Sequence, residues 1–237
     1  MNSISTGHSR QGIGECRLPA TPDVAYSAKS GRYFTGVRRA FLDALPANPG
    51  ARLLELGCGN GNTAACARAE GKCGWCCGVE LCEAPAAEAR SKLDHVVVGD
   101  IENLVLDLPP ASLDVLLMSE VLEHLRDPAA VLSKLRPLLR PGAIVLAGSP
   151  NVCHYSVLLM LLRGRWNYER EGIMDETHLR WFSPVTYRRL FEEAGYVVGH
   201  VGPASPLHKK ARLVNALLCG RFEYLFHTQI VLHAHVV

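Results

Sequence analysis

A glycine-rich stretch that follows a carboxylate is the part of the sequence best suited to chemistry. Residues 53–63 read Leu-Leu-Glu-Leu-Gly-Cys-Gly-Asn-Gly-Asn-Thr, so Glu55 stands two positions before Gly57, and glycines recur at positions 59 and 61. Glycines at this spacing let the backbone turn tightly and approach a ligand. The third glycine of a dinucleotide fingerprint would fall at Asn62, which excludes that pattern. A carboxylate here would repel a pyrophosphate but could pair with an amine, which indicates a nucleoside ligand with an amino-acid tail.

Acidic residues also close the next two predicted strands. The strand at 75–79 runs into Glu80 and Leu81, and the strand at 95–101 contains Asp100 and Ile101. Nucleotide-binding sheets hydrogen-bond the ribose hydroxyls with an acid at the end of the second strand. We therefore predict that Glu80 binds a ribose. An ordinary surface carboxylate is the weaker alternative, because the glycine stretch already fixes where this acid should fall.

Two segments of the chain resemble a known enzyme class. Residues 53–63 resemble motif I of the class I S-adenosylmethionine (SAM) methyltransferases. Residues 120–128, Glu-Val-Leu-Glu-His-Leu-Arg-Asp-Pro, resemble the loop after the fourth strand in the subgroup that includes the ubiquinone-biosynthesis O-methyltransferases. The resemblance implies that Asp100 accepts a hydrogen bond from the adenine amino group, and that the loop borders the methionine tail and the acceptor.

The resemblance also implies which residues bind SAM. Many members of the class close an N-terminal aromatic or basic residue over the SAM carboxylate, and Tyr33 or Arg38 is placed to do so here; helix packing and surface charge explain these two residues equally well. The expected SAM contacts are Tyr33, Glu55, Gly57, Cys58, Gly59, Gly61, Glu80, Leu81, Asp100, Ile101, Ser119, Glu120 and Val121.

Two histidines are the candidate catalytic residues. His124 belongs to the 120–128 phrase, and His178 lies in an Asp-x-Thr-His-x-x-x-Phe pattern that resembles one in bacterial small-molecule and cell-surface-sugar methyltransferases. A neutral imidazole is a competent base near neutral pH and could take the proton of a hydroxyl acceptor. The alternative, that each histidine only orders its loop or touches the SAM carboxylate, has equal weight. A carboxylate or amine acceptor would need no strong base.

Residues 152–182 are predicted to form the cap that selects the acceptor. The apolar run 157–162 predicts a helix that is buried in the core rather than exposed to dock a lipid-linked or aromatic acceptor. Beside it lie aromatic and basic residues that suit an active-site rim. The candidates for substrate contact are His154, Tyr155, Trp166, Tyr168 and Arg180.

Strands and helices alternate along the chain, which predicts an α/β fold. We expect a Rossmann-like, doubly wound, seven-stranded sheet with helices on both faces, mostly parallel and with an antiparallel last strand. Ligands of such sheets bind at the carboxyl ends of the strands. The expected domains are a flexible leader at 1–28 and a methyltransferase domain at 29–237. Helices are expected at 29–45, 62–69 and 85–93, from 128 through Leu139, at 184–194 and at 206–218.

The charge and motifs of the chain argue against nucleic-acid binding and against a membrane span. The 237 residues carry 25 basic and 23 acidic side chains, a net charge of +2 that gives no strong field for nucleic acid. The Asn/Asp-Pro-Pro-Tyr phrase of nucleic-acid methyltransferases is missing after the fourth strand. The apolar run 157–162 is too short to span a bilayer, and the first residues lack a signal-peptide layout, so we expect a cytoplasmic protein.

The nine cysteines do not predict a metal site. Cys73-x-x-Cys76 has no second cysteine or histidine pair to complete a zinc site, and Cys76 and Cys77 suit a buried strand. The sequence therefore predicts SAM-dependent methyl transfer to a small-molecule acceptor, with S-adenosylhomocysteine as product and oxygen as the favoured acceptor atom. The alternative is a methyltransferase-like accessory subunit that binds SAM and a partner enzyme. Oligomeric state stays open, with a homodimer as one option.

Overall fold

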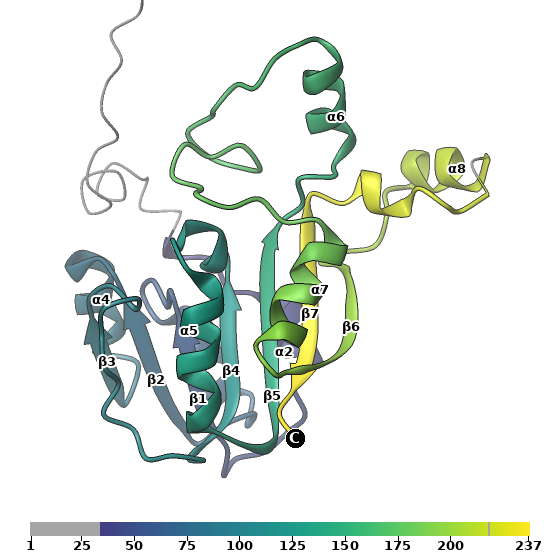
Figure 1. The fold of residues 1–237 in the computed structure, drawn as a ribbon. Coiled ribbons are helices and arrows are strands. Elements are labelled where there is room, and N and C mark those ends of the chain that lie inside the picture. Colours follow the sequence, from purple (N-terminus) through teal and green to yellow (C-terminus); the bar gives the residue numbers. More distant parts are fainter. Residues whose placement is uncertain (1–33, 218) are drawn as a thin grey trace, which may run out of the picture.

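A seven-stranded mixed sheet forms the centre of the molecule in the computed structural model, which describes residues 34–217 and 219–237 (Figure 1). Its order is β3-β2-β1-β4-β5-β7-β6. Neighbouring strands from β3 to β5 pair in parallel, and β7 pairs antiparallel with both β5 and β6. This confirms the predicted fold. The strands are β1 (Arg52–Leu56), β2 (Trp75–Glu80), β3 (His95–Val98), β4 (Leu113–Ser119), β5 (Leu139–Pro150), β6 (Val197–Pro203) and β7 (Gln229–His235).

Helices cover both faces of the sheet (Figure 1). They are α2 (Arg39–Ala44), α3 (Asn62–Ala69), α4 (Glu83–Ala89), α5 (Pro128–Leu135), α6 (Tyr155–Leu162), α7 (Pro184–Glu193) and α8 (Lys209–Leu217), with short 3-10 turns η2 (Leu122–His124), η3 (Arg136–Leu138) and η4 (Glu223–Phe226). One hydrophobic core lies under α5 and α7, and a second lies under α2, α3 and α4. Cys76 and Cys77 are buried in β2, as predicted.

Several element boundaries differ from the predictions; the strand predicted at 95–101, for example, ends at Val98 as β3. The predicted helix through Leu139 ends at Leu135, because Pro137 cannot donate a backbone hydrogen bond, and Leu139 instead begins β5. The predicted helix 85–93 starts and ends earlier, as α4. Of the predicted helix 29–45, only α2 is helical among the described residues. Tyr33 and the leader 1–28 lie outside the described residues.

The apolar helix α6 is exposed, so the expectation of a helix buried in the core is wrong. Val157 is buried, but Leu158, Leu161 and Leu162 are 44%, 50% and 74% exposed. The helix stands beyond the ends of β5 and β7, above the sheet rather than against its face (Figure 1). Only one side of it therefore finds a packing partner. No helix in the described ranges is long and apolar enough to cross a membrane.

Candidate functional site

The glycine turn after β1 has the backbone geometry that only glycine adopts readily. Gly57, Gly59 and Gly61 have φ angles of 63°, 53° and 77°. A Cβ on Gly59 would lie 2.6 Å from the carbonyl oxygen of Phe34, and one on Gly57 would lie 2.7 Å from Val121 Cγ2. Close packing around the turn thus explains why side chains are excluded, and it brings the loop after β4 against the loop after β1.

Two backbone N–H groups orient the Glu80 carboxylate, one from the glycine turn and one from just after β2. Its Oε2 accepts a hydrogen bond from the Gly59 N–H at 2.9 Å, and its Oε1 accepts one from the Cys82 N–H at 3.0 Å. Burial raises the pKa of Glu80, and these backbone donors oppose the rise. The carboxylate is thus fixed between the glycine turn and the end of β2, beside the predicted ribose position.

Glu55 lies beneath the glycine turn. It is 4% exposed, and its Oε2 accepts a hydrogen bond from the Ala64 N–H in the first turn of α3 at 3.1 Å. Burial raises its pKa to about 8, although the Ala64 hydrogen bond opposes the rise. Glu55 therefore links β1 to α3, in addition to any contact with a ligand amine.

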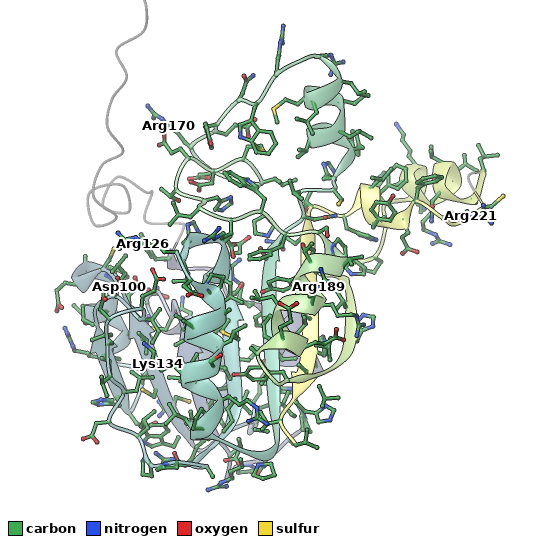
Figure 2. The ribbon with its side chains drawn as sticks, viewed as in Figure 1. Asp100, Arg126, Lys134, Arg170, Arg189 and Arg221 are labelled. Atoms are coloured by element: carbon green, nitrogen blue, oxygen red, sulfur yellow. The ribbon has the colours of Figure 1, made fainter. Side chains whose placement is uncertain are left out.

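Asp100 lies at the carboxyl edge of the sheet, just after β3. Its carboxylate accepts hydrogen bonds from the Glu102 N–H at 2.9 Å and the Asn103 side chain at 2.8 Å. Ile101 beside it is buried. Figure 2 shows Asp100 and Arg126 at this same edge, below the cap segment that carries Arg170. The acids after β2 and β3 and the glycine turn after β1 therefore share one edge.

The end of β4 contributes Ser119 and a strained Glu120. Glu120 has a φ of 55°, a left-handed conformation that is uncommon for a residue with a side chain. Its carboxylate accepts hydrogen bonds from Arg38, at 3.0 Å, and from Gln229. The Arg38 guanidinium, which we predicted as one of two groups that could close over the SAM carboxylate, is thus paired with Glu120. A cavity of about 260 Å³ opens here between α2 and the ends of β4, β5 and β7.

His124 and His178 lie side by side, although 53 residues separate them in the sequence. Their ring centroids are 4.7 Å apart in an edge-to-face arrangement. His124 Nδ1 lies 3.2 Å from both the carbonyl oxygen and the hydroxyl of Thr177, and His178 Nδ1 lies 3.1 Å from the Ile173 carbonyl oxygen. Since a carbonyl only accepts, the Nδ1 atoms donate and Nε2 carries the lone pair in each neutral ring.

The cap is tied to the loop after β4 next to these histidines. The backbone N–H groups of Leu179 and Arg180 donate to the Glu123 carbonyl oxygen at 2.8 and 3.0 Å. Asp175 is buried and accepts from both the N–H and the hydroxyl of Thr177. The Thr177 hydroxyl can then accept from His124 Nδ1–H, so Asp175 and Thr177 together fix the orientation of the His124 ring.

The five cap candidates lie in three separate places. His154 is the N-cap of α6 and bonds Ser156, while Tyr155 stacks against it with centroids 4.4 Å apart. Trp166 and Tyr168 gather around Trp181, with centroid distances of 5.4 and 6.1 Å. The Arg180 guanidinium donates to the Arg126 carbonyl oxygen. The structure brings together Trp166 and Tyr168, and it places Arg180 against the loop after β4.

Sequence reasoning missed a buried polar cluster beside the histidines. Glu123 is 1% exposed, and the hydroxyls of Ser149 and Tyr187 lie buried near its carboxyl group. Burial, and then the nearby Glu120 carboxylate, raise the pKa of Glu123 well above its ordinary range. Burial, and then the Glu123 carboxyl, raise that of Tyr187. The neighbouring phrase at 120–128 drew attention to His124, but no local signal reveals that Tyr187 approaches Glu123.

Comparison with known proteins agrees with the fold. A 37.1 kDa protein from a Streptomyces fradiae transposon is 30% identical over 84% of this chain and 56% of its own length. The ubiquinone biosynthesis O-methyltransferase of Aeromonas salmonicida is 26% identical over 70% of this chain and 73% of its own. A SAM-dependent methyltransferase from Archaeoglobus fulgidus superposes with a TM-score of 0.63 at 21% identity, covering 86% of this chain and 96% of that one.

The chain spans a little over half the length of the first two curated relatives that it matches. The family profile described as a methyltransferase domain matches residues 29–201, which include the glycine turn, Glu80, Asp100, the loop after β4 and the cap. The chain therefore belongs to the methyltransferase-domain family, as its resemblance to the class I SAM-dependent methyltransferases predicted.

Proposed function

We propose that this protein binds SAM and transfers its methyl group to an oxygen of a small-molecule acceptor, releasing S-adenosylhomocysteine. One observation carries the proposal: the glycine turn, Glu80, Asp100 and the loop after β4 converge at the carboxyl edge of one parallel sheet. The likeness to a ubiquinone biosynthesis O-methyltransferase supports an oxygen acceptor.

Each acid has a separate role in the proposed complex. Glu80, held by two backbone N–H groups, accepts from the ribose hydroxyls. Asp100 and Ile101 contact the adenine, and the glycine turn admits the methionine tail. A bound sulfonium amino acid also brings a positive amine toward buried Glu55, which favours the ionised carboxylate.

Methyl transfer from a sulfonium is an in-line displacement. The acceptor oxygen forms a bond to the methyl carbon while the carbon–sulfur bond breaks, and its electron pair stays on the sulfur of S-adenosylhomocysteine. The protein aligns the three atoms and excludes water. A hydroxyl acceptor also loses a proton. His124 and His178 are the proposed groups that manage this proton, since both Nδ1 atoms donate to carbonyls and both Nε2 atoms carry a lone pair.

Calorimetric titration with SAM tests the pocket. Glu80→Ala should weaken SAM binding by about 10- to 100-fold, since hydrogen bonds to a charged group contribute roughly 1.5–3 kcal/mol. Gly59→Val should abolish binding, because its Cβ would meet Phe34 and its φ is left-handed. Glu83→Ala, an exposed acid that begins α4, is the matched control and should bind like the wild type. Unchanged affinity in both Glu80→Ala and Gly59→Val would show that the pocket lies elsewhere.

An acceptor screen with methyl-labelled SAM tests the transfer itself. Turnover of a hydroxyl compound, reduced in His178→Ala, supports the oxygen-directed function. Tight SAM binding without turnover, together with a second enzyme that co-purifies from the native host, would instead favour the accessory-subunit alternative. The cap residues Trp166, Tyr168, His154, Tyr155 and Arg180 are the proposed determinants of which acceptor is used.

A further inference from the structure

We propose that α8 docks on an anionic lipid surface, with its apolar side in the surface and its basic side chains on the lipid headgroups. The helix belongs to an insertion at 204–228, between the end of β6 and the start of β7. Figure 1 shows α8 standing out to the side of the sheet, and the short turn η4 is its main neighbour. The helix therefore projects from the molecule instead of covering a face of the sheet.

The apolar side of α8 faces away from the protein. The buried residue of the helix is Asn215, whose Oδ1 accepts a hydrogen bond from the Phe222 N–H at 3.3 Å. At about 3.6 residues per turn, Leu213, Val214 and Leu217 lie on the opposite side of the helix from Asn215. Leu213 is 65% exposed and Leu217 is 77% exposed. Since an amphipathic helix normally buries its apolar side, this reversed orientation indicates that another surface covers the leucines.

The charge of the insertion indicates the kind of surface. Four basic side chains of the insertion are exposed: Lys209, Lys210, Arg212 and Arg221. Figure 2 shows Arg221 beside α8. Residues 204–222 contain no Asp or Glu, and none of the four cations forms an ion pair within the described ranges. Exposed arginines of other helices do pair, as Arg188 does with Glu192 in α7. The insertion therefore carries uncompensated positive charge that suits an anionic partner.

The combination of side chains favours lipid over the other anionic partners. Nucleic acid would bind the cations through its phosphates but leave the exposed leucines in water. A stable protein interface needs about 800 Å² from each partner, more than three aliphatic side chains on one short helix provide. A lipid surface uses both features, because apolar side chains enter the acyl boundary while Lys and Arg bind the headgroups. Phe222 and Tyr224, both exposed next to the helix, are of the aromatic type found at this boundary.

The docking is peripheral and takes place near one edge of the sheet. With nine residues, α8 is too short to cross a bilayer and lies along its surface. The insertion ends where Gln229 of β7 pairs with Pro150, the last residue of β5. It therefore leaves the sheet at the carboxyl edge, which also carries Glu80 and Asp100. Lipid binding by α8 does not depend on the proposed methyl transfer.

Sedimentation of the full chain with lipid vesicles tests the charge part of the proposal. We expect binding to vesicles of equal parts phosphatidylcholine and phosphatidylglycerol, little binding to phosphatidylcholine alone, and weaker binding as salt is raised. The double variant Lys209→Gln/Lys210→Gln should weaken binding by about 30-fold, since each basic residue near an anionic surface changes it about fivefold. Arg188→Gln/Arg189→Gln removes the same charge from α7 and should bind like the wild type.

Leu217→Gln tests the apolar side of the helix in the same assay. It should weaken vesicle binding by about 10-fold or more, the usual effect of losing one buried leucine side chain. Val185→Gln is the matched control, because Val185 on α7 is 76% exposed, as Leu217 is 77% exposed, and lies on a different helix. It should bind like the wild type. Circular dichroism of each variant shows whether it is folded.

Three results would overturn the proposal. They are equal binding to neutral and anionic vesicles, no binding to either, and unchanged binding in both Lys209→Gln/Lys210→Gln and Leu217→Gln. A chain that binds no vesicles but forms a dimer by light scattering, lost in Leu217→Gln, would assign the apolar side of α8 to a second copy instead. SAM calorimetry on the same samples reports on the proposed function separately, so that either proposal can fail without the other.

Discussion

Buried carboxyl groups are the main feature of the site at the scale of single residues. Glu55, Glu80 and Glu123 are each at most 5% exposed, and burial is the largest cause of the raised pKa of each. The protein bears this desolvation cost where a cationic ligand could offset it. Glu55 gives the clearest test, because burial raises its pKa to about 8 even though hydrogen bonds from Ala64 and Thr63 and the charge of Arg38 oppose the rise.

Glu55 should make the ligand-free protein less stable as pH rises. Between its ordinary pKa of 4.5 and the folded value of about 8, the folded protein holds a proton that the unfolded chain has lost. The free energy of unfolding therefore falls with rising pH, by up to about 1.4 kcal/mol per pH unit for this one group. Urea unfolding between about pH 5 and pH 7.5 should show a smaller fall in Glu55→Gln than in the wild type.

Glu83→Gln is the control for this pH series. Its hydrogen bond with Arg90 lowers the pKa of Glu83, so it titrates below the range studied and should leave the slope unchanged. Equal slopes in Glu55→Gln and the wild type would contradict the assignment of the proton to Glu55.

At the scale of elements, α7 has the strongest start signal among the helices of residues 34–217 and 219–237. The Ser183 hydroxyl accepts from the Thr186 N–H at 3.1 Å, the Thr186 hydroxyl accepts from the Ser183 N–H at 2.9 Å, and Pro184 occupies the first helical position. The helix carries Tyr187 and Phe191 into the core over the sheet. Loss of the N-cap hydrogen bonds at Ser183 therefore weakens both the core packing of α7 and the C-terminal end of the 152–182 segment.

Ser183→Ala should lower the free energy of unfolding by about 1 kcal/mol, within a usual range of 0.5–2 kcal/mol for lost N-caps. Urea denaturation measures it. Ser133→Ala, on the exposed side of α5, makes the same chemical change inside a helix and should be neutral or slightly stabilising, because alanine favours helix interiors. If Ser133→Ala lowered the free energy of unfolding as much as Ser183→Ala, the lost N-cap of α7 would not be the cause.

The sequence predicted the elements whose signals are local. Buried parallel strands read as short apolar runs, so β2 was placed within a residue, and the helix predicted at 184–194 begins at Pro184 as α7. The end of α5 was missed because Leu138 and Leu139 continue its apolar spacing past Pro137. The exposure of α6 could not be predicted, since an apolar run does not reveal whether a sheet face is within its reach.

The candidate site likewise contains residues whose proximity the sequence predicts and residues whose proximity it does not. Glu80 and Asp100 follow strands directly, so strand order alone brings them to one edge. The contact between His124 and His178 depends instead on how the cap folds back over the sheet. The sequence around either histidine does not indicate that the other lies beside it. Glu123 was overlooked because a glutamate beside a histidine gives no sign of burial when it is read in the sequence alone.

At the scale of the whole molecule, one buried asparagine joins the sheet to the structures above it. Asn151 follows β5 and is fully buried. Its side chain donates to the carbonyls of Tyr224 and His227 at 2.7 and 2.8 Å, and it accepts from the Cys153 N–H at 3.0 Å. Its backbone forms a bridge with Phe182, at the other end of the cap. Both ends of the cap and the entry to β7 therefore meet at this residue.

Asn151→Leu should loosen the cap while the sheet stays folded. The change leaves two carbonyls and one N–H buried without partners, and each costs roughly 1–3 kcal/mol. Since the partners of this side chain all lie outside β1 to β4, the loss should appear as local opening rather than global unfolding. Hydrogen exchange should accelerate in 152–182 and 224–229 and remain slow in β1, β2 and β4. Asn167→Leu, an exposed position in the same cap, should exchange like the wild type. Uniform acceleration across the sheet in Asn151→Leu would contradict a cap that opens separately from the sheet.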